Sequence, residues 1–514
     1  MLLIDAVRRN AAFRADEIAT IDGEEQYTWA QFAQRVARAA DGLRQMGVAP
    51  GDRVGILAWN SARYLEAQFA IWWMGGVLVP MNIRWSVEEN LYCIRDAGIT
   101  ALVFDTGFAE AARAIAAQAE GSLRHIILDA ATDEAATAFE DLIAQGTAID
   151  AHDTSHDNLA GIYYTGGTTG FPKGVMLSFL ALWTAAIGIV LANRMAPGGR
   201  MLHATPMFHL ADGGMSHGAM IQGATHVFVP RFDPADVIAM IDRHQVTDVL
   251  LVPTMIGMLQ TSDAYAPEKL RSLRCLSFGA SPIPAPILAR LQADLPHVNL
   301  LHVYGQTEMG PTISYLEPHH QVPGGPKALS VGKPFACAEA KVVDADGVEV
   351  APGVPGEIMA RGPSAMMGYW NKPQDTAKTI IDGWVKTGDV AYKDADGFLF
   401  ICDRVKDMII TGGENVFCAE VENAVSAHPA VAQVAVIGVP DPDFGERVHA
   451  VIVPKPGQTL TADDLKAHCK TLIANYKCPR SIELRDALPV SAAGKILKRT
   501  LREPHWTGHA RAVN

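Results

Sequence analysis

The sequence has little of several residue types and patterns that mark particular classes of protein. Only seven cysteines occur in 514 residues, at scattered positions, and no two of them form a CxxC pair. A disulfide framework and a cysteine-based zinc site are therefore not indicated, and a reducing compartment such as the cytoplasm is expected. Lysine and arginine total 43 against 56 acidic residues, which gives a net charge of −13. Because nucleic-acid binding needs a basic face, we expect no nucleic-acid partner.

Long hydrophobic runs are also scarce. The most apolar run, FLALWTAAIGIVLAN at 179–193, is shorter than the roughly 20 residues that a membrane span needs. It is predicted to be a buried helix, and no transmembrane segment is expected. The first residues, MLLIDAVRRN, contain Asp5 and no long apolar region, so no signal peptide is expected.

The chain is too long for one compact core and is expected to form two or more domains. Thr28 and Gln31 predict a capping box for a helix that ends before Gly47. Apolar runs typical of strands alternate with helical stretches along the first part of the chain, at 100–104, 125–129, 248–253, 274–278 and 300–304. This alternation predicts an α/β fold with largely parallel sheets.

The amino-acid composition of the sequence changes after about residue 325. Valine, glycine and proline become frequent, and DADG occurs at 344–347 and again at 394–397, which predicts short strands and hairpins. A domain boundary is expected within 401–416. A small α+β domain is predicted beyond it, with helices and strands at 418–428, 431–439, 449–454 and 463–474.

The segment YYTGGTTGFPKGV, residues 163–175, combines glycines, threonines and a lysine. Glycines let the backbone turn tightly and present N–H groups, which together form a concave site for anions. Thr165, Thr168 and Thr169 add hydroxyl groups, and Lys173 adds a mobile positive charge. The segment therefore predicts a polyphosphate-binding loop, with a plain surface turn as the alternative.

The spacing within this loop does not fit one class of nucleotide-binding protein. A Walker A loop reads GxxxxGK[ST], whereas here Pro172 precedes the lysine and Gly174 follows it. A P-loop kinase or GTPase is therefore not indicated. We expect the loop to join a strand at 161–164 to a helix that starts near Gly174.

Three further motifs carry side chains suited to nucleotide chemistry. LLHVYGQTEMGP places Tyr304 and Glu308 after a strand, where open parallel sheets bind ligands; the tyrosine could stack on a base and the glutamate could bind Mg²⁺. DGWVKTGDV offers Asp389 for ribose hydroxyls, and PVSAAGKILKR offers Lys495 beside a glycine. Taken alone, the first motif is equally typical of a solvated loop, the second of a turn and the third of a basic surface.

Taken together, the motifs occur in the order and spacing of a known superfamily. The chain resembles the adenylate-forming enzymes, which comprise acyl- and aryl-CoA synthetases, nonribosomal adenylation domains and luciferases. The resemblance runs from about residue 5 to residue 502, and it is strongest to stand-alone acyl-CoA synthetases. It is carried by residues 164–174, 304–310, 387–389, 403–415 and 489–495.

The resemblance implies a fold, a division into domains and a reaction. The fold is α/β, with a large N-terminal domain (1–404) of parallel-rich sheets flanked by helices plus a small β-barrel subdomain. A small mobile α+β C-terminal domain (405–514) acts as a lid. The reaction consumes ATP, with Mg²⁺ as the metal, to join a small-molecule carboxylic acid to AMP with release of pyrophosphate. The acyl group is then transferred to coenzyme A.

The resemblance also implies roles for individual residues. Lys173 and the loop hold the β- and γ-phosphates, Tyr304 packs on adenine, Thr307 contacts the α-phosphate, and Lys495 reaches the carboxylate. The candidate catalytic residues are Lys495, Lys173, Thr307, Glu308 and His209, and the candidate metal ligands are Glu308 and Thr165. The candidate nucleotide- and CoA-binding residues are Thr165, Gly166, Gly167, Thr168, Thr169, Gly170, Gly279, Ala280, Ser281, Tyr304, Gly305, Asp389, Arg404, Lys406, Gly412 and Gly413. Among these, Asp389 and Arg404 hold the ribose, Lys406 lies at the inter-domain hinge, and Gly412 and Gly413 belong to a loop used in the thioester step.

Two positions depart from the pattern of the superfamily. Gly166 replaces the usual serine, which removes one hydroxyl contact of about 1–2 kcal/mol, and backbone N–H groups are expected to compensate. In PMFHLADGG, His209 stands where amino-acid-activating relatives usually have an aspartate that pairs with the substrate amine. An amino-acid substrate is therefore not expected, and His209 is assigned to the acyl pocket or the thiol tunnel, with a structural role as the alternative.

The acid itself is less well defined than the reaction. Apolar side chains expected around the acyl group are Trp183, Leu210, Met215, Met255, Met258 and Met309. Because methionines suit adaptable apolar pockets, a medium- or long-chain fatty acid is favoured over an aryl or cinnamate-type acid. An enzyme that loads a carrier protein, an ADP-forming kinase or ATPase, and a non-catalytic sensor remain as alternatives. A homodimer is a family expectation only.

Overall fold

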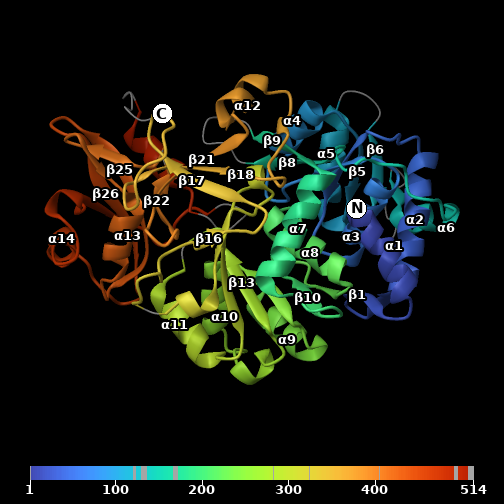
Figure 1. Ribbon diagram of the computed structural model, residues 1–514, viewed down its shortest axis with the longest axis horizontal. Coiled ribbons are helices and arrows are strands. Elements are labelled where there is room, and N and C mark those ends of the chain that lie inside the picture. The colour runs from blue at the N-terminus through green and yellow to red at the C-terminus, as the bar shows by residue number, and fades with distance from the viewer. Residues whose placement is uncertain are drawn as a thin grey trace. The chain divides into compact units, whose positions relative to one another are not determined.

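The computed structural model describes residues 2–119, 123–128, 136–165, 172–281, 283–322, 324–404, 406–490 and 496–507 (Figure 1). The chain forms two compact units. The large unit comprises Met1–Glu339 and Ala360–Val385, and the small unit comprises Ala340–Met359 and Lys386–Asn514. The α/β fold class expected from the sequence is confirmed, with a large N-terminal region of sheets and helices and a small C-terminal one. A domain boundary at 404/405 stays a prediction.

The first sheet of the large unit has nine strands in the order β16-β15-β14-β13-β12-β10-β11-β1-β2. Strands β1 and β10 to β14 pair in parallel, and the three outer strands β2, β15 and β16 are antiparallel. The strands are β1 (Ile18–Asp22), β2 (Glu25–Thr28), β10 (Arg200–His203), β11 (Thr225–Phe228), β12 (Asp248–Leu251), β13 (Cys275–Gly279), β14 (Asn299–Tyr304), β15 (Ser314–Leu316) and β16 (Lys333–Pro334).

The second sheet of the large unit has eight strands in the order β19-β9-β8-β4-β3-β5-β6-β7. Strands β3 to β8 pair in parallel, whereas β9 pairs antiparallel with both β8 and β19. The strands are β3 (Arg53–Leu57), β4 (Val77–Pro80), β5 (Ile99–Phe104), β6 (Arg124–Ile127), β7 (Thr137–Ala138), β8 (Leu159–Thr165), β9 (Lys173–Ser178) and β19 (Gly368–Tyr369).

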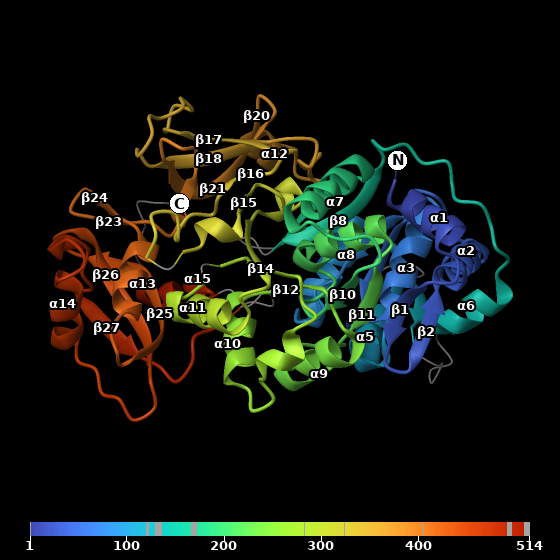
Figure 2. The same ribbon diagram turned by 60° about the horizontal axis from the view of Figure 1, so that its bottom comes forward.

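Helices cover both sheets and fill the space between them (Figure 2). Helices α7 and α8 pack on both sheets, α9 to α11 cover the outer face of the first sheet, and α4 and α5 cover the outer face of the second. The helices are α1 (Leu3–Phe13), α2 (Trp29–Gln45), α3 (Ala62–Trp73), α4 (Val87–Ala97), α5 (Ala109–Gln118), α6 (Phe139–Gln145), α7 (Phe179–Asn193), α8 (Leu210–Gln222), α9 (Pro234–His244), α10 (Pro253–Thr261), α11 (Ala285–Asp294) and α12 (Pro373–Thr379).

The buried strands explain this layering. In β12, Val249 and Leu251 join the core beneath α9 to α11, whereas Leu250 joins the core beneath α7 and α8. Because successive side chains of a strand point to opposite faces, a run of aliphatic residues is required where both faces are covered. The five strands that the sequence predicted between residues 100 and 304 are all present, as β5, β6, β12, β13 and β14.

The polyphosphate-type loop is the part of the fold where the sequence was misread. Lys173 begins β9, which pairs antiparallel with β8, so the helix expected near Gly174 is wrong. The segment from 173 to 178 forms a strand because it pairs with β8 on one side and with the short edge strand β19 on the other. The helix begins only at Phe179, where the Ser178 hydroxyl accepts a hydrogen bond from the N–H of Ala181 at 3.1 Å. Helix α7 then spans the apolar run 179–193, as expected.

The β-rich region that follows contains a five-stranded sheet in the order β17-β18-β21-β20, with β22 also paired to β21. Both DADG sequences form tight turns. The carboxylates of Asp344 and Asp394 each accept hydrogen bonds from backbone N–H groups two and four residues later. The strands are β17 (Glu339–Val343), β18 (Gly356–Arg361), β20 (Ile380–Ile381), β21 (Trp384–Lys393) and β22 (Leu399–Arg404).

The C-terminal part of the small unit is a second five-stranded sheet, in the order β24-β23-β26-β25 with β27 paired to β26. Helices α13 and α14 pack on one face, and Leu501 of α15 packs on the other. The elements expected here are confirmed as α13 (Cys418–Ser426), β25 (Val431–Asp441), β26 (Gly445–Pro454) and α14 (Ala462–Lys470). The others are β23 (Ile409–Thr411), β24 (Glu414–Val416), β27 (Ser481–Leu484) and α15 (Lys498–Arg502).

Two further expectations concern the whole chain. All seven cysteines are free thiols. Among the residues that the structure describes, none of the helices is both long enough and apolar enough to cross a membrane.

Candidate active site

The polyphosphate-type loop connects the last residue of β8 to the first residue of β9. Thr165 and Lys173 face each other across this hairpin, and the Thr165 hydroxyl donates to the Lys173 carbonyl at 3.5 Å. Gly166, Gly167, Thr168, Thr169 and Gly170 lie outside the described residues. The structure thus fixes the two ends of the loop and places its lysine on a strand.

Lys173 contacts two side chains from a distant part of the chain. Its Nζ lies 2.8 Å from Oδ2 of Asp375 on α12 and 5.2 Å from the ring centroid of Tyr369 on β19. The hydrogen bond from Lys173 holds the pKa of Asp375 below its usual value. The lysine side chain is 27% exposed, so it is held in place while one side still faces solvent.

Glu308, which follows a strand of the first sheet, contacts the same tyrosine, Tyr369. It lies in the 3-10 helix η3 (Thr307–Met309), which follows β14, and its Oε1 accepts a hydrogen bond of 2.9 Å from the Tyr369 hydroxyl. Burial and the Glu308 carboxylate raise the pKa of Tyr369 well above its usual value, so the hydroxyl stays protonated and acts as a donor. Thr307 begins the same turn. Tyr369 therefore joins the candidate phosphate ligand Lys173 to the candidate metal ligand Glu308.

The carboxyl ends of β13 and β14 lie side by side at the edge of the first sheet. Gly279 pairs with Val303, which places Ala280 and Ser281 beside Tyr304 and Gly305 at the strand ends. Ala280 has a φ of 67°, a conformation that L-residues rarely adopt. Such strain is concentrated at ligand sites, and strand ends of this kind are where parallel sheets bind nucleotides.

Two glycines at this edge are required by close packing. A Cβ on Gly279 would collide with the carbonyl oxygen of Val303, and one on Gly305 would collide with that of Pro311. Both residues were expected at the nucleotide site, and the structure shows that each lets the backbone approach a neighbouring segment.

His209 precedes the first residue of α8 and stands at its N-cap. Its ring packs against Phe208 with centroids 4.2 Å apart. The six apolar side chains expected around the acyl group are distributed over separate cores. Leu210 and Trp183 belong to the core between the sheets, Met255 packs with α9 to α11, and Met258 is 50% exposed. Met215 and Met309 are fully buried.

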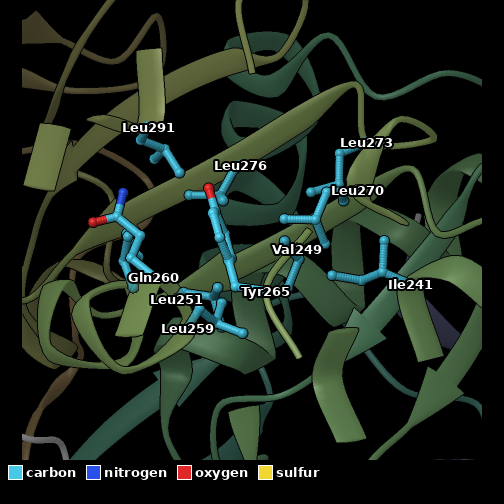
Figure 3. A pocket seen from close by; sticks show the side chains of 11 residues that line it. Ile241, Val249, Leu251, Leu259, Gln260, Tyr265, Leu270, Leu273, Leu276 and Leu291 are labelled. Carbon is cyan, nitrogen blue, oxygen red and sulfur yellow. The ribbon is translucent and has the colours of Figure 1, made fainter. Parts of the chain in front are cut away.

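A small apolar cavity lies apart from these strand ends (Figure 3). It is inside the core between the first sheet and α9 to α11, and its lining includes Ile241, Val249, Leu276 and the ring of Tyr265. None of the candidate site residues lines it, so we assign it no role in the reaction.

The small unit carries a separate group of candidate residues. Asp389 on β21 faces Arg404 on β22 directly across the antiparallel pair, and its Oδ1 lies 3.3 Å from Nε of Arg404. Asp389 is 7% exposed, whereas the side chain of Arg404 is 53% exposed. The preceding Gly388 has a φ of 72°, so the TGD sequence bends the strand instead of ending it.

The remaining candidates of the small unit that the structure describes lie at or just before strands β23 and β24 of its C-terminal sheet. Gly412 and Gly413 form the two-residue turn between β23 and β24, with φ values of 60° and 84° that favour glycine. The carbonyl of Lys406 accepts a hydrogen bond from Arg502 on α15. Lys495 lies outside the described residues.

Two residues at the site were missed by sequence reasoning, Tyr369 and Asp375. Both belong to GYWNKPQDT, residues 368–376, which lies between β18 and β21 and carries an aromatic residue, a proline and an aspartate close together. This composition is typical of a turn followed by a short helix and carries no nucleotide-binding signal. The large unit thus brings a lysine, a glutamate and a tyrosine together at the carboxyl ends of its strands, an arrangement suited to binding a polyphosphate with its metal ion.

Comparison with known proteins shows the family to which the chain belongs. Residues 7–370 match the family described as AMP-binding enzyme, and residues 420–495 match the C-terminal domain of the same enzymes. The chain is 38% identical over 499 residues to a feruloyl-CoA synthase of an Amycolatopsis species, covering 96% of this chain and 97% of the relative. It is 34% identical to a fatty acid–[acyl-carrier-protein] ligase of Streptomyces coeruleorubidus, covering 95% and 93%.

Solved structures agree with this result. The o-succinylbenzoate CoA synthetase from Bacillus subtilis in complex with its acyl-adenylate intermediate has a TM-score of 0.86 at 31% identity, covering 99% of both chains. The same enzyme in complex with ATP and a magnesium ion has a TM-score of 0.84 at 31% identity, covering 96% of this chain and 98% of that one. The chain therefore belongs to the AMP-binding enzyme family and is an adenylate-forming acid–thiol ligase of the acyl-CoA synthetase type.

Proposed function

We propose that this enzyme converts an aromatic acid of the phenylpropenoate type, such as ferulate, into its CoA thioester. The observation that carries the proposal is the 38% identity to a feruloyl-CoA synthase over 96% of the chain. The apolar composition of the acyl region favoured a fatty acid, but Met258 is 50% exposed and Met255 lies in a different core from Leu210 and Trp183, so these side chains give that preference little support.

We propose that the large unit binds the triphosphate and the metal ion. Lys173 and the loop from Thr165 to Gly170 hold the phosphates, and Tyr304 with Gly279, Ala280 and Ser281 bounds the adenine. Glu308 fits a Mg²⁺ ion because it offers hard carboxylate oxygens and only Oε1 is held by Tyr369. Bound there with Thr165, the ion would offset phosphate charge during attack on ATP.

The chain's own groups then account for the first step. Two anions, the carboxylate and the α-phosphate, must approach each other, and Lys173, Thr307 and Lys495 supply the compensating hydrogen-bond donors. Lys173 is held by Asp375 at 2.8 Å, and we propose that it turns from this partner to the phosphates when ATP binds. Asp389 and Arg404 hold the ribose.

The second step requires a thiol to displace AMP from the acyl group. We propose that the C-terminal region beyond residue 404 moves about Lys406 between the two steps, so that Lys495 serves adenylation and the Gly412–Gly413 turn serves thioester formation. The acyl-adenylate is prone to hydrolysis, so the site must exclude water until the thiol arrives.

A second candidate function is the loading of a fatty acid onto a carrier protein. It is favoured by the 34% identity to a fatty acid–[acyl-carrier-protein] ligase over 95% of the chain. The two candidates share the adenylation step and differ in the acid and in the thiol.

A substrate panel tests the proposal. The purified chain is given ATP, Mg²⁺ and either CoA or a phosphopantetheinylated carrier protein, with ferulate, benzoate, octanoate or palmitate as the acid. We expect kcat/KM for ferulate with CoA to exceed that for octanoate by about 10-fold or more, because discrimination by shape in an apolar pocket reaches this range. A preference for palmitate on the carrier protein would replace the first candidate with the second.

A further inference from the structure

Three potential metal ligands from different segments converge on the C-terminal sheet of the small unit. His449 lies on β26, Glu483 lies on β27, and His505 ends the 3-10 helix η6 (Glu503–His505) after α15. Strands β26 and β27 are parallel neighbours, with His449 paired to Ser481. Because side chains two residues apart in a strand share a face, Glu483 lies on the same face as Ser481 and His449.

The distances between these ligand atoms fit one small ion. Nε2 of His449 lies 3.7 Å from Oε2 of Glu483, and Nε2 of His505 lies 3.9 Å from the same oxygen. One ligand atom from each residue lies within 4.8 Å of the other two. Bond lengths of about 2.0–2.2 Å in a tetrahedral zinc site place neighbouring ligand atoms roughly 3.4 Å apart, so small side-chain shifts would complete the geometry.

The buried nitrogen of His449 points independently to a ligand. The residue is 5% exposed, its Nδ1 lies 2.7 Å from the Ser481 hydroxyl oxygen, and its Nε2 has no hydrogen-bond partner among the residues that the structure describes. A buried polar atom left without a partner is costly and therefore uncommon. If Nδ1–H donates to Ser481, the lone pair of Nε2 is free for a metal, which is the usual outer-shell arrangement of a histidine ligand.

The other two ligands are arranged to reach the same point. The rings of His449 and His505 are 5.1 Å apart and tilted by 55°, so they are not stacked on each other. Oε1 of Glu483 is held by Nε of Arg485 at 2.5 Å, which leaves Oε2 toward the two imidazoles. The side chains of Glu483 and His505 are about one-third exposed, so a water molecule can reach a fourth position.

We propose that His449, Glu483 and His505 form a binding site for a divalent transition-metal ion, with Zn²⁺ as the occupant. Two imidazoles and one carboxylate are a ligand set that zinc prefers. The ion would fasten the C-terminal 3-10 helix to the sheet of β26 and β27. Its role would be structural, and the inference does not depend on which acid the enzyme uses.

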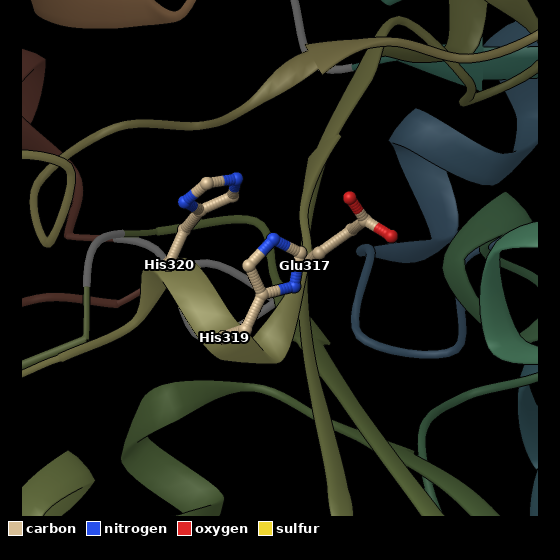
Figure 4. A group of neighbouring side chains, drawn as sticks. All are labelled: Glu317, His319 and His320. Atoms are coloured by element: carbon tan, nitrogen blue, oxygen red, sulfur yellow. The ribbon is translucent and has the colours of Figure 1, made fainter.

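A second group, Glu317, His319 and His320, provides a matched comparison (Figure 4). It sits in one short segment around η4 (Pro318–His320), and none of its members is buried. Figure 4 shows these three side chains, and one ligand atom from each lies within 4.8 Å of the other two. The group contains similar ligand types without the buried, unpartnered nitrogen, so we expect it to bind zinc weakly or not at all.

The test is metal binding by the full chain after removal of metals with a chelator. Zn²⁺ is titrated by calorimetry, and Co²⁺ is used as a visible probe of geometry, with wild type, His505→Ala, Glu483→Gln, Ser481→Ala and His319→Ala. We expect one high-affinity Zn²⁺ per chain and a tetrahedral Co²⁺ spectrum without a thiolate charge-transfer band. Ser481→Ala should weaken binding about 10- to 100-fold, as loss of an outer-shell partner does, and His505→Ala should weaken it further. His319→Ala should bind as wild type does.

Several results would overturn the proposal. They are equal Zn²⁺ affinity in wild type and His505→Ala, loss of binding in His319→Ala, or a thiolate band that assigns the metal to cysteines. Thermal unfolding gives a second readout that does not need activity. Zn²⁺ should raise the Tm of wild type and of His319→Ala but leave those of His505→Ala and Glu483→Gln unchanged. Equal shifts in all four chains would show adventitious binding only.

Discussion

Each compact unit contains a lysine that lies 2.8 Å from a carboxylate, and the two lysines have different surroundings. In the large unit, Lys173 reaches Asp375 and keeps one side toward solvent. In the small unit, Lys498 on α15 reaches Glu422 on α13. Burial alone would lower the pKa of Lys498, but the neighbouring Cys418, Glu422 and Asp403 raise it well above the usual value.

The difference indicates which lysine is available to a ligand. Lys173 has one partly exposed carboxylate partner and can exchange it for phosphate oxygens at little cost. Lys498 is enclosed among several acidic groups, and its removal would leave Glu422, whose side chain is mostly buried, without its positively charged partner. We infer that the lysine on the hairpin serves the reaction and the lysine on the helix serves stability.

The largest expected effect is on catalysis, from Lys173→Ala. We expect acid-dependent ATP–pyrophosphate exchange to fall about 100- to 1,000-fold, as it does when a preorganised donor is removed from a transition state. Thermal unfolding should change little. Arg243→Ala removes an exposed ion pair of 2.9 Å with Glu24 in the same unit and should leave exchange unchanged. Normal ATP–pyrophosphate exchange in Lys173→Ala would contradict the inference that Lys173 serves the reaction.

The opposite pattern, a loss of stability with little change in catalysis, is expected from Lys498→Met. Loss of the charge should destabilise the fold by up to about 3 kcal/mol, because a mostly buried carboxylate loses its partner. Urea unfolding measures this change, and Lys393→Met, which removes an exposed pair of 2.6 Å with Glu349, should cost less than about 1 kcal/mol. Unchanged stability combined with lost adenylation would show that Lys498 acts in the reaction.

A smaller effect is expected from Tyr369→Phe. The change removes the hydroxyl that donates to Glu308, a bond to a charged acceptor worth about 1.5–3 kcal/mol. We expect adenylation at limiting Mg²⁺ to fall about tenfold and to recover in part at saturating Mg²⁺. Tyr265→Phe removes a similar bond of 2.8 Å to Asp294 far from the strand ends and serves as the control. If the two variants carried out adenylation at equal rates, the Tyr369 hydroxyl would have no part in holding Glu308 for the metal ion.

The smallest effect is expected from Asp375→Asn. Lys173 lowers the pKa of Asp375, so the ion pair stabilises the fold above the ordinary carboxyl range, and this contribution is lost as the pH falls through the lowered pKa. Because the pair is partly exposed, the variant should be less stable by under about 1 kcal/mol at pH 7. The difference should vanish as the pH is lowered through that pKa, measured by urea unfolding. A higher KM for ATP in Asp375→Asn would contradict the exchange of partners that we propose for Lys173.

Much of the fold could be predicted because its signals are local. The Thr28–Gln31 capping box forms as expected, with hydrogen bonds of 2.9 and 3.3 Å. The apolar run at 179–193 becomes α7 with the same bounds. The parallel strands at the centre of the first sheet are short, continuous apolar runs because both of their faces are covered.

The misread parts depend on partners that are distant in the sequence. Strand β9 is specified by its pairing with β8 and β19, and its own residues show no alternation that would indicate a strand. The contacts of Tyr369 with Glu308 and of Lys173 with Asp375 join segments that no periodic pattern connects. The roles of Lys495 and of Gly166, Gly167, Thr168, Thr169 and Gly170 in the polyphosphate-type loop stay predictions, since these residues lie outside those that the structure describes.

The most direct test of the account follows the oxygen atoms of the acid. Ferulate labelled with ¹⁸O in its carboxylate is incubated with the enzyme, ATP, Mg²⁺ and CoA, and the nucleotide product is examined by mass spectrometry. If the carboxylate attacks the α-phosphorus and AMP leaves on transfer to the thiol, each AMP carries one ¹⁸O and equals the thioester in amount. Labelled inorganic phosphate together with ADP would contradict an acyl-adenylate pathway.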